Sequence, residues 1–150
     1  MAKFVYRMQN ILDIKRKLET QAQMTFAEAN AKYREEQQLL QEYLFKRTQC
    51  ENRLKKAMEG RIHVSDVTIA KSELNSMRTI VRRQMMEVHK AERVMEDARA
   101  ALNEIVQERK VQEKLREKAF DQFKKERAEQ EMKEIDELVS YSFNDKNTKE

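Results

Sequence analysis

The sequence predicts an all-α fold: an antiparallel two-helix coiled-coil hairpin whose second helix is longer than the first. Gly60 is the only glycine among the 150 residues and proline is absent, so little else in the chain interrupts a helix. Charged residues make up 39% of the chain and its mean hydropathy is −0.96, yet apolar residues recur three and four positions apart. The turn signals gather around Gly60 alone, so we expect the chain to reverse direction there.

The first predicted helix covers residues 4–58. Its apolar stripe consists of Phe4, Met8, Ile11, Leu18, Ala22, Phe26, Ala29, Tyr33, Leu40, Tyr43, Cys50, Leu54 and Ala57. Two successive steps of four, from Leu18 to Ala22 to Phe26, predict a stutter that locally relaxes the supercoil. Glu36 and Arg47 fall on the same stripe and weaken it.

The predicted bend covers residues 59–65. Gly60 suits the left-handed position that ends many helices, because a side chain there would be penalised. Ser65 is expected to cap the second helix, and Asp66 to complement the positive end of its dipole. Val64 and Ile69 have the spacing of a hydrophobic staple around that cap.

The second predicted helix covers residues 66–139. Its stripe has a strict spacing of three and four through Val67, Ala70, Leu74, Met77, Val81, Gln84, Val88, Ala91, Met95, Ala98, Leu102 and Ile105. Only Gln84 among these is polar, which predicts a left-handed coiled-coil seam. Beyond Ile105 the phase is expected to drift through Val111, Leu115, Ala119, Phe120 and Phe123. Residues 140–150 are predicted to be a polar tail, and residues 1–150 a single domain.

A short connection makes the second helix an intramolecular partner of the first at high effective concentration. Antiparallel pairing then brings together positions whose numbers add up to about 124. Phe4 should meet Phe120 or Phe123, and Tyr43 should lie near Val81. The end of the second helix should extend past the first, leaving its apolar residues without an intramolecular partner. An amphipathic helix of this kind is marginal alone in water, so we expect another protein to hold it.

The composition argues against an enzyme. A phosphate-binding loop needs several glycines, and this chain has one. Cys50, His63 and His89 are expected at different heights along a thin rod, so neither a catalytic constellation nor a metal site is predicted. No cofactor is predicted either.

The expected location is the cytoplasm. Cys50 is the only cysteine, so no internal disulfide can form, which suits a reducing compartment. No run approaches the ~20 apolar residues that cross a bilayer, so direct membrane insertion is not expected.

Some apolar residues lie off the seam at mid-length. Phe45 falls at the most outward heptad position, and Leu44 and Ile80 flank the seam. They form either isolated exposed apolar positions or a patch for a partner protein, and the sequence leaves both interpretations open.

Both ends of the chain resemble the flagellar export protein FliJ family. The opening match is Phe4-Val5-Tyr6-Arg7-Met8-Gln9-Asn10-Ile11-Leu12-Asp13, and the closing match is Glu131-Met132-Lys133-Glu134-Ile135-Asp136-Glu137-Leu138. The resemblance implies a non-enzymatic coiled coil of the bacterial flagellar type III export apparatus, similar in shape to the central stalk of rotary ATPases. It also implies peripheral association with the cytoplasmic face of the membrane through partners.

The implied partners are a hexameric flagellar export ATPase, the cytoplasmic domain of the export gate, and export chaperones. The end that would insert into the ATPase ring carries Phe4, Met8, Ile11, Phe120, Phe123, Met132, Ile135 and Leu138. The shaft that would face the gate carries Leu40, Tyr43, Leu44, Phe45, Leu74, Met77, Ile80 and Val81. The implied activity is to promote assembly of the ATPase ring and couple it to the gate.

Two other functions remain open from the sequence. A generic coiled-coil tether or spacer would pair two chains in parallel through both helices. A basic helical nucleic-acid binder would fit the net charge of +4, but acidic and basic residues are interleaved rather than gathered on one face, so no nucleic-acid partner is expected.

Overall fold

The computed structural model describes residues 2–148, and within them the chain forms two helices, α1 (Gln9–Ala57) and α2 (Val64–Thr148). The predicted all-α class and the greater length of the second helix are confirmed. Contacts divide these residues into two compact units. The hairpin unit spans Thr20–Glu104, and the terminal unit contains the described residues up to Glu19 and from Ile105 onward. The single domain predicted for residues 1–150 stays a prediction.

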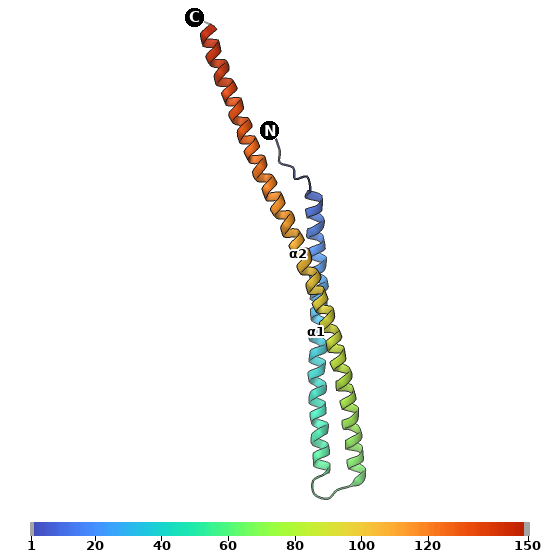
Figure 1. Ribbon diagram of the computed structural model, residues 1–150. Helices are drawn as coiled ribbons and strands as arrows, with labels where there is room; N and C mark the ends of the chain where they lie inside the picture. Colours follow the sequence, from blue (N-terminus) through green and yellow to red (C-terminus); the bar gives the residue numbers. More distant parts are fainter. Residues whose placement is uncertain (1, 149–150) are drawn as a thin grey trace. The chain divides into compact units, whose positions relative to one another are not determined.

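In the hairpin unit, α1 and α2 run antiparallel on either side of the bend (Figure 1). Every seam position predicted for the second helix from Val67 to Leu102 is buried or half-buried. Leu74 and Val81 are the most enclosed of them, with exposed fractions of 4% and 2%. On α1, Ala29 and Cys50 are buried against this seam. The predicted coiled-coil hairpin is therefore confirmed in this unit.

Gln84, the one polar residue of the predicted α2 seam, is buried and pairs with Glu36 of α1. Its side-chain amide donates to the Glu36 carbonyl at 3.0 Å and also to the Glu36 carboxylate. Lys32 adds an ion pair to the same carboxylate at 3.0 Å. The hydrogen bond from Gln84, followed by that from Lys32, lowers the pKa of Glu36. The two polar positions that interrupt the seam thus satisfy each other, which fixes the register of the hairpin.

The bend is shorter than predicted, because α1 ends at Ala57 and α2 begins at Val64. Gly60 has a φ of 67°, which confirms its left-handed conformation. The predicted cap at Ser65 is wrong: the Val67 amide already donates to the His63 carbonyl at 3.2 Å, which places Ser65 inside the first turn. The staple is also wrong, since Val64 and Ile69 are 78% and 59% exposed.

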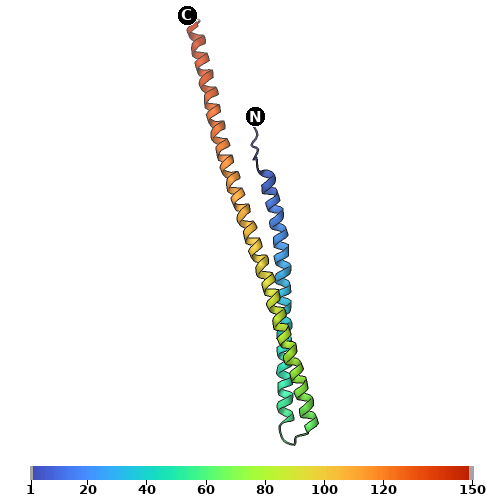
Figure 2. The ribbon, with the colours of Figure 1, turned by 45° about the vertical axis from the view of Figure 1, so that its right-hand side comes forward.

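The terminal unit corrects both predicted helix ends. α1 begins at Gln9 rather than at residue 4, and the preceding segment is irregular. This segment lies beside α2 in both ribbon views, and α2 continues past it (Figures 1 and 2). The polar tail predicted from residue 140 is helical to Thr148, because nothing in that stretch breaks a helix; residues 149 and 150 lie outside the described residues.

The seam of the terminal unit differs from the predicted one. Leu12 is fully buried, whereas Leu18 and Ile11 are 38% and 39% exposed. The half-buried positions that follow are Lys15, Glu19 and Ala22, so the spacing of three and four is unbroken and the predicted stutter is wrong. On α2 the phase continues through Arg109, Gln112, Ala119 and Phe123 without the predicted drift. What changes after Ile105 is the chemistry of the seam, which becomes polar.

Leu12→Ala is expected to open the terminal unit selectively. Truncating a fully buried leucine costs about 2–5 kcal/mol, and few other apolar side chains enclose this seam. Hydrogen exchange should therefore accelerate at amides of residues 9–19 while amides around Val81 stay protected. Leu18→Ala, which truncates a partly exposed leucine on the same turns, is the matched control. Equal effects of the two substitutions would contradict the placement of Leu12, rather than Leu18, in the seam.

Candidate partner-binding surfaces

The irregular N-terminal segment is anchored on α2 by aromatic side chains. Phe4 lies 5.1 Å from Phe120 in an edge-to-face arrangement and 5.5 Å from Phe123, measured between ring centroids. The predicted meeting of Phe4 with these residues is confirmed. Tyr6 is buried, and its hydroxyl donates to the Gln112 side chain at 3.1 Å. Leaving the helix before Gln9 gives the chain the freedom to place both rings against α2.

An ion-pair network follows along the same seam. Lys15 bonds Glu108 at 2.7 Å, and Arg109 pairs with both Glu19 and Glu113. Arg109 and Glu19 keep only 22% and 15% of their side-chain surface exposed. The hydrogen bonds from Arg109 to Glu113 and then Glu19 raise the pKa of its guanidinium. This stretch of the terminal unit is therefore joined by paired charges where the hairpin unit uses apolar packing.

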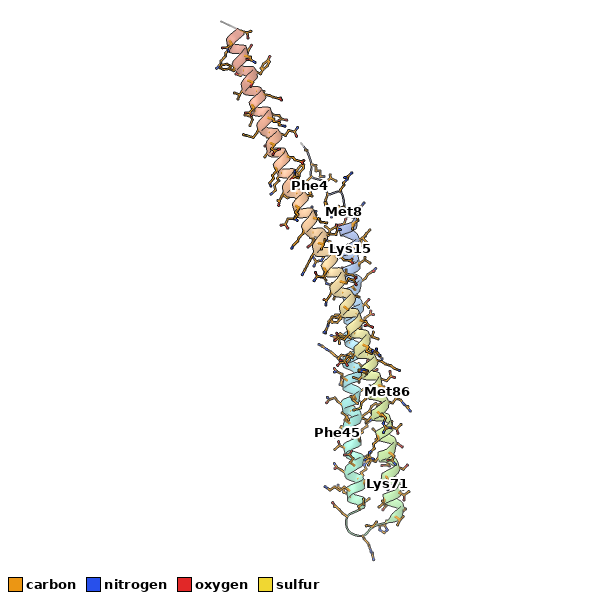
Figure 3. All side chains as sticks on the ribbon, viewed as in Figure 1. Phe4, Met8, Lys15, Phe45, Lys71 and Met86 are labelled. Carbon is orange, nitrogen blue, oxygen red and sulfur yellow. The ribbon has the colours of Figure 1, made fainter. Side chains whose placement is uncertain are left out.

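The predicted ring-end residues fall into two groups. Phe4, Phe120 and Phe123 form the aromatic cluster, and Met8 and Ile11 lie nearby on α1 with 39% of their surface exposed. Figure 3 labels Phe4 and Met8 at the start of the chain. The second group consists of Met132, Ile135 and Leu138, which are 62%, 55% and 68% exposed on α2. Every described residue from Lys124 onward is exposed.

The sequence prediction missed part of this second group. Val139, Tyr141 and Phe143 are also exposed, at 63%, 75% and 64%. Ile135, Leu138, Val139 and Phe143 line one shallow surface depression together with Ser142 and Lys146. The spacing of four from Ile135 to Val139 to Phe143 was the available signal, and it was lost by assigning residues 140–150 to a tail.

The predicted shaft residues also divide. Leu74 and Val81 are buried in the seam, so they are core residues and expose almost nothing to a partner. Leu40, Tyr43, Leu44, Met77 and Ile80 are half-buried. Phe45 is 66% exposed, and Met86 on α2, which was not predicted as a shaft residue, is 61% exposed (Figure 3). The exposed apolar positions of the hairpin unit are thus off the seam.

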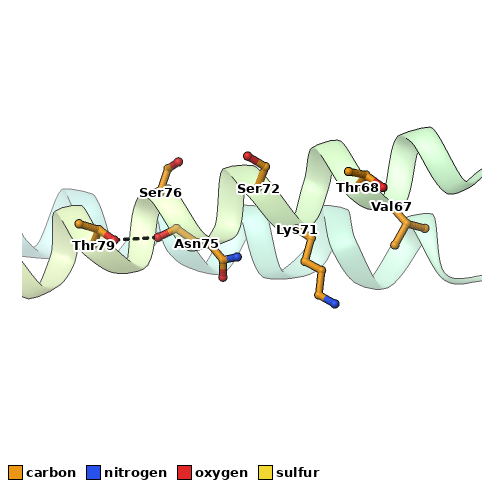
Figure 4. A pocket seen from close by; sticks show the side chains of 7 residues that line it. All are labelled: Val67, Thr68, Lys71, Ser72, Asn75, Ser76 and Thr79. Atoms are coloured by element: carbon orange, nitrogen blue, oxygen red, sulfur yellow. Dashed lines mark hydrogen bonds between the residues drawn. The ribbon is translucent and has the colours of Figure 1, made fainter.

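A surface depression on α2 near the bend has a different character (Figure 4). It is lined by Val67, Thr68, Lys71, Ser72, Asn75, Ser76 and Thr79. The Thr79 hydroxyl donates to the Asn75 carbonyl at 3.1 Å, which satisfies it within the helix. None of these lining residues is a carboxylate, an imidazole or a thiol, so they offer no general base.

Metal binding and membrane insertion find no support in residues 2–148. These residues contain no group of three or more His, Cys, Asp or Glu side chains placed to hold a metal ion. Neither α1 nor α2, over the same residues, has a stretch apolar enough to cross a membrane. What the described residues do present is exposed apolar surface on helices.

Comparison with known families gives one match of nearly full length. A family model described as the flagellar FliJ protein matches residues 4–148. The comparisons with curated proteins and with solved structures found no match.

Proposed function

This chain belongs to the flagellar FliJ protein family, whose members are components of the flagellar export apparatus, and from that membership we propose the following function. The protein binds a hexameric flagellar export ATPase through its terminal unit and promotes assembly of the ATPase ring. It contacts the cytoplasmic domain of the export gate through the hairpin unit, and it escorts export chaperones. It works by protein contacts and carries out no reaction itself.

The observation that carries the proposal is the exposed apolar surface at the end of α2. Met132, Ile135, Leu138, Val139 and Phe143 each expose more than half of their surface. A helix that exposes this much apolar surface gains free energy by docking it on another protein. Promotion of ring assembly follows if that contact exists only in the assembled state, because binding then shifts the assembly equilibrium.

The hairpin unit supplies the second proposed contact. Phe45 and Met86 project apolar surface from α1 and α2, while Leu44 and Ile80 lie half-buried at the flanks of the seam. Under this proposal Leu74 and Val81 support the gate-facing surface from inside rather than touching the gate. Association with the membrane would come through that partner.

The test is to add the purified chain to the cognate ATPase. The expected result is a several-fold stimulation of ATP hydrolysis, with no hydrolysis by the chain alone. The stimulation should decline when ring assembly is already saturated by high ATPase concentration, because the chain acts on assembly. Tight ATP binding by the isolated chain, or an unchanged hydrolysis rate, would contradict the proposal. A stable elongated dimer of the isolated chain would favour the tether instead, and sedimentation of the 18.1 kDa chain decides between them.

A further inference from the structure

The sign of the charge changes along α2. Within residues 126–148 there are seven acidic side chains against three basic ones. The acidic residues are Glu126, Glu129, Glu131, Glu134, Asp136, Glu137 and Asp145, and the basic ones are Arg127, Lys133 and Lys146. The whole chain nevertheless has a net charge of +4, so everything before residue 126 is net basic. The end of α2 is therefore an acidic segment of a basic protein.

The apolar residues of this segment do not continue the seam. In the phase that Ala119 and Phe123 set, the next seam positions are polar: Glu126, Gln130, Lys133, Glu137 and Ser140. Met132, Ile135, Val139 and Phe143 have helical spacing of their own and form a second stripe, which we call the terminal apolar face. At about 100° per residue this face is centred on roughly the opposite side of α2 from the seam. It is therefore not a continuation of the surface that packs against α1.

Acidic residues border the terminal apolar face on both sides. On the same helical count, Glu129 and Asp136 lie along one border and Glu131 along the other. Glu131 pairs with Arg127 at 3.4 Å, and all of these side chains are exposed. Two copies of this face packed together would bring acidic borders against each other, which disfavours a second copy of the chain as the occupant.

We propose that the terminal apolar face docks in an apolar groove whose rim carries lysine and arginine side chains. The inference rests on the proposed function, and it assigns that groove to the export ATPase. The apolar side chains supply the buried contact, and the acidic borders select a basic rim and accelerate association. The N-terminal segment packs through Phe4 on the seam side of α2, so the ATPase binds without displacing it.

The experiment measures the Kd of the full chain for the cognate ATPase and compares two charge-reversal variants. Glu129→Lys with Asp136→Lys reverses one border of the face. Glu126→Lys with Glu137→Lys makes the same change in net charge on the seam side, where Gln122 donates to Glu126 at an exposed site. Circular dichroism of both variants checks that α2 remains helical.

We expect the border variant to bind at least tenfold more weakly and the seam-side variant to bind within about threefold of the unaltered chain. A third variant, Ile135→Ser with Val139→Ser, should lose about a hundredfold by removing buried apolar contact. Raising the salt concentration should weaken the unaltered chain more than the border variant, because screening acts on the charges that were reversed.

The outcomes separate the two claims. If the unaltered chain binds the ATPase but both charge variants weaken binding equally, only bulk charge matters and the docking geometry is overturned. Tight binding by the Ile135/Val139 variant would overturn it too, while leaving the proposed function standing. If the unaltered chain does not bind the ATPase at all, the proposed function falls, and the assigned occupant falls with it.

Discussion

Val81→Asp is expected to unfold the hairpin unit, whereas Phe45→Asp is expected to leave it folded. Val81 is 2% exposed in the seam, so an aspartate there must either bury an unpaired charge or open the helices. We expect a loss of about 3–5 kcal/mol, a large share of the stability of a domain of this size. Phe45 is 66% exposed, and its replacement should change stability by no more than about 0.5 kcal/mol.

Thermal unfolding followed by circular dichroism measures the difference. The comparison also bears on the shaft, because both residues were predicted to face the gate. Loss of gate binding by Val81→Asp would report unfolding, while loss by Phe45→Asp would report a missing contact. If both variants unfold at the same temperature as the unaltered chain, the assignment of Val81 to the core is incorrect.

The second helix was predictable over most of its length because its seam is written in apolar residues. From Val67 to Ile105 each predicted position is buried or half-buried. Gln84 fits the same spacing although it is polar, since its partner Glu36 occupies a seam position on α1. Gly60 was predictable for a local reason, the positive φ that ends α1.

The first helix was less predictable because hydropathy describes one strand of a seam at a time. Lys15 and Glu19 look like surface residues until Glu108 and Arg109 are placed opposite them. Choosing the apolar Leu18 and Ile11 instead shifted the predicted stripe, and Leu12 was missed. Paired charges across two helices leave no periodic apolar signal, so only the paired structure reveals them.

The ends failed for a different reason. The composition of residues 140–150 resembles a polar tail, and that impression outweighed the helical spacing of Val139 and Phe143. At the other end, the aromatic residues Phe4 and Tyr6 were assigned to a helix. Their contacts with α2 compete with helix formation there, and this competition is a tertiary effect that local sequence does not report.

Deleting residues 126–150 is expected to abolish binding to the export ATPase while leaving the hairpin unit intact. The deletion removes the terminal apolar face and its acidic borders but keeps Phe120 and Phe123, so Phe4 retains both aromatic contacts. Every described residue that it removes is exposed, so little intramolecular packing is lost. We expect affinity for the ATPase to fall at least a hundredfold, as measured by titration calorimetry.

The matched control is Phe45→Ala in the full chain, which should bind the ATPase normally because the substitution lies in the other unit. Hydrogen exchange at Leu74 and Val81 should be the same in the deletion variant and the unaltered chain, since their protection comes from the seam of the hairpin unit. Faster exchange there would mean that the end of α2 supports the fold as well as the contact. Undiminished ATPase binding would place the contact on the aromatic cluster around Phe4, which the deletion leaves in place.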